Sequence, residues 1–399
     1  MSYSLEHLLV ITGGYPSQQR PADYTFVDQL VRALAQLGPR CSVVSPVAIH
    51  DHLSGQLPPH RDKITSNGTK PISVLRPRYI SVSNRRFGPL RAASITQLMF
   101  ERAVLRALRS IDPHPNALYG HFLYASGATA ARLGCRLGIP SFVAVGESSF
   151  WSVRPYGFER ARRDFRDITG CIAVSSLLKR EMVSKLNIPS DRVRVFPNGV
   201  DLRKFYPHNK SAMREAFGFP RDTFIVAFVG HFTDRKGVLR VAEAIRGLKG
   251  VDVVFAGSGP LVPEGSNILF KGVLPHNQVP HLLSAADVFV LPTKREGCCN
   301  AILEALACGL PVVTSDREFN DGIIDGTVGI RVDPLSVEAI REAVRTLRDD
   351  PNLRQQMSSL AHRKAQCFSI RERAGKMLDW MQAEVVGASA TTEQVGCGC

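Results

Sequence analysis

The chain has 399 residues, of which 44% are apolar and 22% charged, so it can bury a large core; about 150 residues per domain predicts two or three domains. No stretch reaches the roughly 18 uncharged apolar residues of a membrane-spanning helix, because even the apolar region 117–146 contains Arg132 and Arg136. The first residues, MSYSLEHLLVITGG, lack the positively charged N-terminal region and the cleavage site of a signal peptide. We therefore expect a cytoplasmic protein without a signal peptide. Nine scattered cysteines are typical of reduced packing thiols rather than of a disulfide framework.

Positive charge is concentrated in the first half of the chain. Residues 1–198 hold 26 Lys and Arg against 13 Asp and Glu, so +13 of the net charge of +14 lies there. Two arginine clusters stand out, RPRYISVSNRRFGPLR at 76–91 and RPYGFERARRDFRD at 154–167. Such a face either binds an anionic membrane surface or phosphorylated substrates, or is a solvated surface. No nucleic-acid-binding motif accompanies the charge, so we expect no nucleic-acid partner.

Short β-rich runs alternate with helical patterns along both halves of the chain. The first half predicts strands at 8–11, 41–45, 72–75, 117–119, 141–145, 171–174 and 192–196, with helices at 25–37, 95–110, 126–137 and 176–186. The second half predicts strands at 224–230, 251–257, 268–272, 288–291 and 311–315, with helices from 238, at 279–286 and from about 299 or 300. Strands that alternate with helices imply right-handed crossovers and parallel sheets. The sequence therefore predicts an α/β protein of two doubly wound domains.

The two series of elements define the predicted domains. The first domain is expected at 1–198 and the second at 199–368, with the break in the polar stretch YPHNKSAMREAFGFPRD at 206–222. A helix at 369–386 is expected to return to the first domain, and 387–399 is expected to form a flexible tail.

Unusual residues follow several of the predicted strands. In open α/β sheets, ligands bind beyond the carboxyl ends of the strands, at loops that run into helix N-termini. Gly13 and Gly14 follow the first strand, where they allow close backbone approach. The loop GHFTDRKG follows the strand at 224–230 and places His231, Arg235 and Lys236 just ahead of a helix. A ligand site is therefore expected at these loops.

The segment TKREGCCNAILEALACGLPVVTSD at 293–316 sets Glu296 and Glu304 eight positions apart around a helix start. Backbone N–H groups at Asn300 and Ala301, the positive helix end and the ammonium of Lys236 are suited to cradle a diphosphate. Glu304, about one turn inside the helix, can accept two hydrogen bonds from a vicinal diol such as a ribose, and Glu296 lies on the opposite side of the cradle. A ribose, a diphosphate and a second hydroxylated ring together describe a nucleotide sugar.

These motifs carry a resemblance to a known family. The order VGHFTDRKG, FAGSGP, LFKGVLP, LSAADVFVLPT, E-x7-E in EGCCNAILE, and ALACGLPVVTSD resembles the donor half of glycosyltransferase family 4, over nearly all of 192–345. The first half resembles the family more loosely, through GYP, GHF at 120–122 and RLGIPSFVAV at 136–145, and PNGVDLRKF at 197–205 is similar to the usual bridge. The resemblance implies a retaining enzyme of GT-B fold, with two Rossmann-like domains facing a central cleft.

The resemblance also implies roles for single residues. Glu296 is implied to contact hydroxyls of the transferred sugar, Glu304 to hold the ribose and Lys236 to neutralise the diphosphate, while the base lies against backbone near Val273. The implied mechanism is front-side attack in which the leaving phosphate takes the acceptor proton, so catalysis is mainly stabilisation of leaving-group charge. The chain has no Asp-x-Asp motif, so no metal and no other cofactor is expected. The expected partners are a nucleotide-sugar donor and a glycan, lipid-linked or small-molecule acceptor.

We assign the candidate residues to three groups. Catalytic roles are expected for Glu296, Lys236 and His231. Donor binding is expected for Gly14, Gly230, Val273, Asn300, Ala301 and Glu304. Acceptor-side positions in the basic first domain are expected to be His121, Glu147 and Asn198.

Two departures from the family pattern keep alternatives open. His231 stands where the family usually has an arginine, and Gly146 and Glu147 stand where many members have His-Gly. These departures leave the identity of the sugar open. They also leave two alternative functions open: a non-catalytic relative that binds a nucleotide sugar without transferring it, or another chemistry of the same fold, such as that of an epimerase. His121 is either an acceptor-side group or a core histidine, and Glu147 is either catalytic or a cap of the next element.

Overall fold

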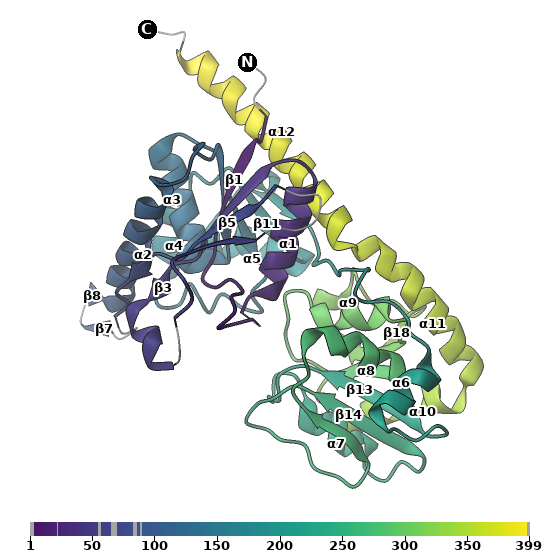
Figure 1. Cartoon of the computed structure of the whole chain (residues 1–399). Coiled ribbons are helices and arrows are strands. Elements are labelled where there is room, and N and C mark those ends of the chain that lie inside the picture. Colours follow the sequence, from purple (N-terminus) through teal and green to yellow (C-terminus); the bar gives the residue numbers. More distant parts are fainter. Residues whose placement is uncertain are drawn as a thin grey trace. The chain divides into compact units, whose positions relative to one another are not determined.

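The computed structural model describes residues 4–21, 23–54, 57–64, 70–82, 86–87 and 90–396. The chain forms two compact units: unit 1 comprises Met1–Pro197 and Arg373–Cys399, and unit 2 comprises Asn198–Glu372. Each unit is built on a sheet of mostly parallel strands with helices packed on it (Figure 1). The predicted α/β class with two doubly wound domains is therefore confirmed.

Among the described residues of unit 1, eight strands form one sheet. Neighbouring strands are parallel except for the edge pair β4 and β5, which is antiparallel. The chain turns back across the sheet between β1 and β9, so their carboxyl ends mark the topological switch point. The strand order is β12 (Val193–Val195), β11 (Gly170–Ala173), β10 (Ser141–Val145), β9 (Ala117–His121), β1 (His7–Ile11), β2 (Arg40–Val44), β5 (Ile72–Leu75) and β4 (Arg61–Ile64).

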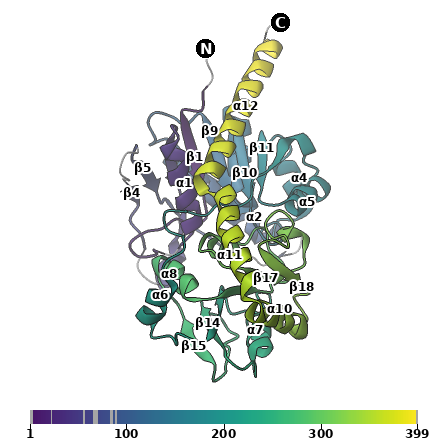
Figure 2. The ribbon, with the colours of Figure 1, turned by 90° about the vertical axis from the view of Figure 1, so that its right-hand side faces the viewer.

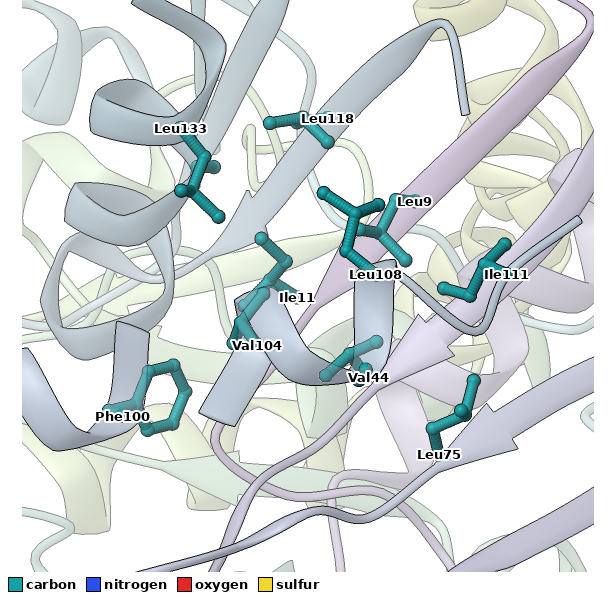
Figure 3. Close-up of a cluster of buried hydrophobic side chains, with 12 residues drawn as sticks. Leu9, Ile11, Val44, Leu75, Phe100, Val104, Leu108, Ile111, Leu118 and Leu133 are labelled. Carbon is teal, nitrogen blue, oxygen red and sulfur yellow. The ribbon is translucent and has the colours of Figure 1, made fainter. Parts of the chain in front are cut away.

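Helices cover both faces of this sheet because its strands are apolar on both sides. Figure 3 shows one face, where β1, β2, β5 and β9 pack against α2 and α3. The helices of unit 1 are α1 (Thr25–Gln36), α2 (Ala92–Leu108), α3 (Ala128–Leu137), α4 (Phe158–Asp164), α5 (Ser176–Leu186) and α12 (Ile370–Gly396). The buried cluster consists of Leu9, Ile11, Val44, Leu75, Phe100, Val104, Ala107, Leu108, Ile111, Leu118, Ala130 and Leu133.

The long helix α12 runs along the sheet of unit 1 (Figure 2). Its Trp380 packs on that sheet. The Trp380 ring lies 5.7 Å from that of Phe142 on β10 and 5.8 Å from that of Phe196. Gly170 on β11 makes room for it, since a Cβ there would lie 2.4 Å from the indole. The helix extends to Gly396, beyond the predicted end at 386 and into the segment predicted as a flexible tail.

Unit 2 has a sheet of six parallel strands. Its switch point lies between β13 and β16. The strand order is β15 (Ile268–Gly272), β14 (Val251–Ala256), β13 (Phe224–Val229), β16 (Val288–Leu291), β17 (Val312–Ser315) and β18 (Gly329–Val332). The helices are α6 (Lys210–Phe217), α7 (Val238–Ile245), α8 (Val279–Ala285), α9 (Asn300–Ala307), α10 (Val337–Asp349) and α11 (Pro351–Ala365).

The polar stretch 206–222 is not the break between the domains, so that prediction is wrong. It contains α6, whose first turn is capped by the side chain of Asn209. Arg214 on α6 is buried, and its Nη2 lies 2.7 Å from Oδ2 of Asp287. The division between the units lies between Pro197 and Asn198 instead, one residue before the boundary of the predicted domains 1–198 and 199–368. A charged residue that the sequence analysis read as linker is thus an ion-paired part of unit 2.

The described residues form no helix that is long and apolar enough to cross a bilayer.

Several elements were not predicted, most of them polar or short. The unpredicted elements are β3 (Val47–Ala48), β4, β6 (Arg78–Tyr79), β7 (Arg86–Phe87), β8 (Leu90–Arg91), β18, α4, α6, α10 and α11.

Candidate active site

The loops at the switch point of unit 2 approach each other closely. Gly257, just after β14, has φ 150°, and a Cβ on it would lie 2.0 Å from the carbonyl oxygen of Gly230. Gly230 itself follows β13 with φ 154°. Only glycine tolerates both this conformation and this contact, so the two glycines let the loops meet. The loop after β13 then leads to Lys236, whose side chain lies near Gly230.

Lys236, Arg235 and Glu296 form a charged cluster at this switch point. Nζ of Lys236 lies 2.8 Å from Oε1 of Glu296, and Nη1 of Arg235 donates to the same oxygen. Thr293 at the end of β16 also donates to Oε1, at 3.2 Å. Nη1 of Arg235 donates in addition to the carbonyl of Arg295 at 2.9 Å, which fixes the guanidinium against the loop. The carboxylate of Glu296 therefore holds two cations on one oxygen.

Burial and charge act in opposite directions on this cluster. Burial alone would raise the pKa of Glu296, but Lys236 and Arg235 lower it, so the carboxylate stays ionised. Burial alone would lower the pKa of Lys236, but Cys299 and Glu296 raise it, so the ammonium stays charged. The site consequently presents fixed positive charge in a shielded place, which is the electrostatic requirement for binding a phosphate group.

The helix α9 starts beside this cluster. Its N-cap is Cys299, whose side chain makes no cap hydrogen bond, whereas Ser336 and Asp350 cap α10 and α11 with their side chains. Sγ of Cys299 lies 3.8 Å from Nζ of Lys236, and burial raises the pKa of this thiol. The N-terminus of α9, with Asn300 in its first turn, thus adjoins an ammonium, and together they suit an anion.

Glu304 lies in the second turn of α9 and has a partner that the sequence analysis missed. Nε2 of His276 lies 3.1 Å from Oε1 of Glu304, and the His276 ring packs on Phe205 at 5.2 Å. His276 opens the short helix after β15, so its position depends on the fold rather than on any local motif. The sequence signal that pointed to this place was LFKGVLP, which directly precedes His276.

Other predicted donor residues of unit 2 lie around these groups. Val273 follows β15 and is 71% exposed, as a flat contact for a base would require. His231 is exposed, in contrast to the shielded Lys236. Ala301 lies in the first turn of α9, next to Asn300. Their roles in donor binding stay predictions.

Asn198 belongs to unit 2, although it was predicted as an acceptor-side residue of the first domain. Its Nδ2 donates to Oδ1 of Asn300 at 2.8 Å and to the carbonyl of Cys298 at 3.1 Å. Its backbone N–H points at Sγ of Cys298, 3.3 Å away. Asn198 therefore braces the loop that carries Glu296, and its placement on the first domain was wrong because the chain crosses into unit 2 one residue earlier.

Glu147 lies at the carboxyl end of β10 in unit 1 and is buried. Oγ of Ser152 lies 2.8 and 2.9 Å from its two carboxylate oxygens, and the N–H of Leu123 donates to Oε1 at 3.1 Å. Burial raises the pKa of Glu147 to about 7, although the hydrogen bonds from Ser152 and Leu123 oppose this. Glu147 thus joins the loops after β9 and β10, and its carboxylate accepts from the N–H of the first residue of the short helical segment Leu123–Gly127.

His121 is the last residue of β9 and is buried. Its Nδ1 lies 3.1 Å from the hydroxyl of Tyr119, and its ring packs on Phe122 at 4.6 Å. Burial, with Arg373 as a second cause, lowers the pKa of His121 to about 3, so the imidazole is neutral. Of the two alternatives left open by the sequence, these contacts favour a core histidine.

Gly14 lies under an aromatic ring at the switch point of unit 1. A Cβ on Gly14 would lie 2.5 Å from Cδ2 of Tyr24, so only glycine fits there. Tyr24 has φ 51° and Phe122 has φ 70°, both in the left-handed region that side chains rarely adopt. Their rings lie 6.0 Å apart. Neither strained residue had a signal in the sequence, since both conformations arise from tertiary packing.

The arginine cluster at 154–167 packs partly into unit 1. Nη1 of Arg160 donates to Oγ of Ser94 at 2.7 Å, and Tyr156 stacks on Tyr124 at 4.0 Å. Trp151 is 56% exposed, and Arg154 and Arg163 are exposed as well. The other cluster, at 76–91, includes 83–85 and 88–89, which lie outside the described residues.

Comparison with known proteins assigns this fold and these motifs to a family. The family model described as Glycosyl transferases group 1 matches residues 209–364, and the model described as Glycosyltransferase Family 4 matches residues 25–204. The Bacillus subtilis (strain 168) protein named "Putative teichuronic acid biosynthesis glycosyltransferase TuaC" is 30% identical over 352 residues, covering 84% of this chain and 88% of TuaC. The chain belongs to glycosyltransferase family 4. It is therefore a glycosyltransferase, and this membership supports a nucleotide sugar as its donor class.

Further similarities extend to an enzyme and to solved structures. The Escherichia coli UDP-Gal:alpha-D-GlcNAc-diphosphoundecaprenol alpha-1,3-galactosyltransferase is 28% identical over 221 residues, which cover 50% of this chain and 57% of that enzyme. Sucrose-phosphate synthase from Thermosynechococcus elongatus superposes with a TM-score of 0.77 at 18% identity, covering 93% of this chain and 97% of that one. Anabaena Alr3699/HepE, solved with UDP, superposes with a TM-score of 0.70 at 15% identity, covering 95% and 100%. The predicted GT-B fold is thus confirmed.

Proposed function

We propose that this glycosyltransferase moves a sugar from a nucleoside diphosphate sugar to a glycan, lipid-linked or small-molecule acceptor, with retention of anomeric configuration and without a metal ion. The observation that carries this proposal is the cluster of Lys236, Arg235 and Glu296 beside the start of α9, in which Lys236 and Glu296 are shielded from solvent. It provides positive charge for a diphosphate, and Glu304 lies one helical turn further along α9 for the ribose.

Lys236 and the first N–H groups of α9 stabilise the leaving diphosphate in the proposed reaction. The bond between the anomeric carbon and the diphosphate oxygen breaks, and negative charge develops on that oxygen next to the ammonium. The acceptor hydroxyl forms its bond on the same face of the sugar and gives its proton to the leaving phosphate. Lys236 and Arg235 bring to the diphosphate the positive charge that a divalent cation supplies in other transferases.

A lipid-linked glycan is the acceptor class that the relatives favour. TuaC is named for teichuronic acid biosynthesis, and the Escherichia coli enzyme is named for a sugar linked to diphosphoundecaprenol. UDP sugars are the first donors to test, because the Escherichia coli enzyme is named for UDP-Gal and HepE was solved with UDP. For this chain we propose the same classes, with the acceptor held by unit 1.

The basic surface of unit 1 supports a peripheral position at an anionic membrane face. Trp151 is exposed and lies three residues before the exposed Arg154, which is the pairing of aromatic and cationic side chains that suits a lipid headgroup layer. Arg163 on α4 is exposed too. We propose that these residues dock unit 1 on the cytoplasmic membrane, where a lipid-linked acceptor would be found.

A transfer assay tests the proposed reaction. The chain is incubated with UDP, GDP and ADP sugars and with short glycan and polyprenyl-diphosphate-linked acceptors, with and without EDTA. Transfer should occur, should survive EDTA, and should give a product with the donor's anomeric configuration by NMR. An inverted product would contradict retention, a loss that magnesium or manganese restores would contradict metal independence, and donor binding without any transfer would favour the non-catalytic alternative.

A further inference from the structure

Arg235 has no role in the residue assignments made from the sequence, yet it shares an oxygen atom with Lys236. Nη1 of Arg235 and Nζ of Lys236 both contact Oε1 of Glu296. Any phosphate group that reaches the ammonium of Lys236 therefore lies within reach of the guanidinium of Arg235. The Arg235 side chain is 41% exposed, whereas those of Lys236 and Glu296 are only 12% and 13% exposed, so Arg235 forms the solvent side of the cluster.

The guanidinium of Arg235 keeps donors for a ligand. Its hydrogen bonds to Glu296 and to the carbonyl of Arg295 both use Nη1. Among the described residues, Nε and Nη2 of Arg235 have no hydrogen-bond partner. These two nitrogens form the parallel pair of donors that matches two oxygens of a phosphate. Arg235 can therefore bind a phosphate group without leaving Glu296.

The neighbouring cations are occupied or placed differently. Asp234 holds two of them, Arg240 at 2.8 Å and Lys294 at 2.6 Å. His231 is exposed and is a weaker cation than arginine. The cluster of Lys236, Arg235 and Glu296 carries a net single positive charge, while a nucleoside diphosphate carries two or more negative charges near neutral pH. Removing Arg235 would leave the cluster neutral.

We propose that Arg235 is the second cationic residue for the donor diphosphate and acts beside Lys236. It would take the role of the arginine that the family usually has at the position of His231. This inference rests on the proposed function, since it assumes a diphosphate donor in unit 2. It predicts that Arg235 recognises the terminal phosphate group specifically. A residue that only orients Glu296, which is assigned to the transferred sugar, would instead leave the binding of both nucleoside monophosphates and diphosphates unchanged.

The test compares nucleoside diphosphates with nucleoside monophosphates on full-length variants. UDP, GDP and ADP, and the matching monophosphates, are titrated calorimetrically into the wild type, Arg235→Met, Arg235→Lys and Arg246→Met. Arg246 is the matched control, because it is an exposed arginine of unit 2 that pairs only with Glu243 on the surface. Thermal melts establish that each variant is folded.

Arg235→Met should weaken binding of the favoured diphosphate by about 10- to 100-fold, the value of one charge-assisted hydrogen-bonding group, and leave the monophosphate nearly unchanged. Arg235→Lys should retain part of the affinity, and Arg246→Met should bind like the wild type. Adding His231→Arg to Arg235→Met should restore diphosphate binding, because it returns a guanidinium to the loop that carries Lys236.

Two results would overturn the inference. Equal losses for monophosphate and diphosphate in Arg235→Met would mean that Arg235 does not recognise the diphosphate, and no loss at all would make it a counter-ion of Glu296 only. Absence of any diphosphate binding in the wild type would overturn the proposed function itself, and the inference with it. The two failures are distinguishable, because the first is seen only in the variant and the second already in the wild type.

Discussion

Nζ of Lys236 lies 2.8 Å from Oε1 of Glu296, although the two residues follow different strands of unit 2 and are 60 positions apart. The parallel sheet brings them together, because β13 and β16 are neighbours and their carboxyl ends lie on the same edge. Their ion pair keeps both groups charged despite burial. The central feature of the proposed donor site is thus a charge pair at a topological switch point.

Lys236→Ala should lower turnover by about 100-fold or more, because it removes a group that stabilises charge on the leaving diphosphate. The measurement is steady-state transfer with the favoured donor. Lys249→Ala is the control, since Lys249 is an exposed lysine of the same unit. Near-normal turnover in Lys236→Ala would mean that the diphosphate binds elsewhere.

Glu304→Ala should mainly raise the Michaelis constant for the donor, by about 10-fold or more, because hydrogen bonds to a ribose are made equally in the ground state and the transition state. His276→Ala should shift the same constant in the same direction by less, since His276 only orients Glu304 at 3.1 Å. The measurement is donor saturation kinetics. A collapsed turnover with an unchanged Michaelis constant would place Glu304 at the reacting centre instead.

Glu147 should make unit 1 less stable as the pH rises. Its pKa is about 7 in the fold, against an ordinary value of 4.5 for a glutamate side chain, so between these values the folded chain holds a proton that the unfolded chain has lost. Stability therefore falls as the pH rises through this window, by about 3 kcal/mol in total.

The variant Glu147→Gln tests this dependence, because it keeps the shape of the side chain but does not titrate. Denaturant unfolding gives the free energy of unfolding of both proteins at pH 4.5 and pH 8. The value for the variant minus that for the wild type should be about 3 kcal/mol larger at pH 8 than at pH 4.5. Tyr24 is a titratable group that interacts with Glu147, and it is unchanged in the variant. A constant difference between the two proteins would refute the titration of Glu147.

The variant Arg154→Glu/Arg163→Glu should bind anionic vesicles more weakly than the wild type. Each arginine near an anionic surface contributes about 1 kcal/mol, so losing two weakens partition by about 30-fold or more at low salt. Arg221→Glu/Arg246→Glu, which changes two exposed arginines of unit 2, is the matched control. Equal partition of the wild type to neutral and anionic vesicles would mean that these arginines form an ordinary solvated surface and do not bind an anionic membrane.

The fold could be predicted because its signals are local. The apolar runs of β13, β14 and β16 are bounded by glycine or proline, and the helix α9 is framed by CCN and by Gly-Leu-Pro. Elements with charged or polar faces were missed. The strand β4 reads Arg-Asp-Lys-Ile, and α6 carries Arg214, whose burial becomes reasonable only once Asp287 lies opposite.

The site could be predicted only in part, for the same physical reason. Glu296, Glu304 and Lys236 stand in motifs, and the fold brings Glu296 and Lys236 into contact. Their partners Arg235 and His276 are set by distances across the fold, which no local pattern encodes. Asn198 was assigned to the wrong unit, because one residue decides on which side of the boundary it lies.

The most direct measurement of the central claim is a thermal-shift titration with UDP, GDP and ADP on the wild type and on a Lys236→Ala/Glu304→Ala variant. A ligand at 100 times its dissociation constant adds about 2.7 kcal/mol of stability, so one of the three should raise the melting temperature of the wild type clearly. The variant should melt cooperatively and show no such shift. A wild type that responds to none of them, or a variant that responds as the wild type does, would contradict a nucleoside diphosphate site at Lys236 and Glu304.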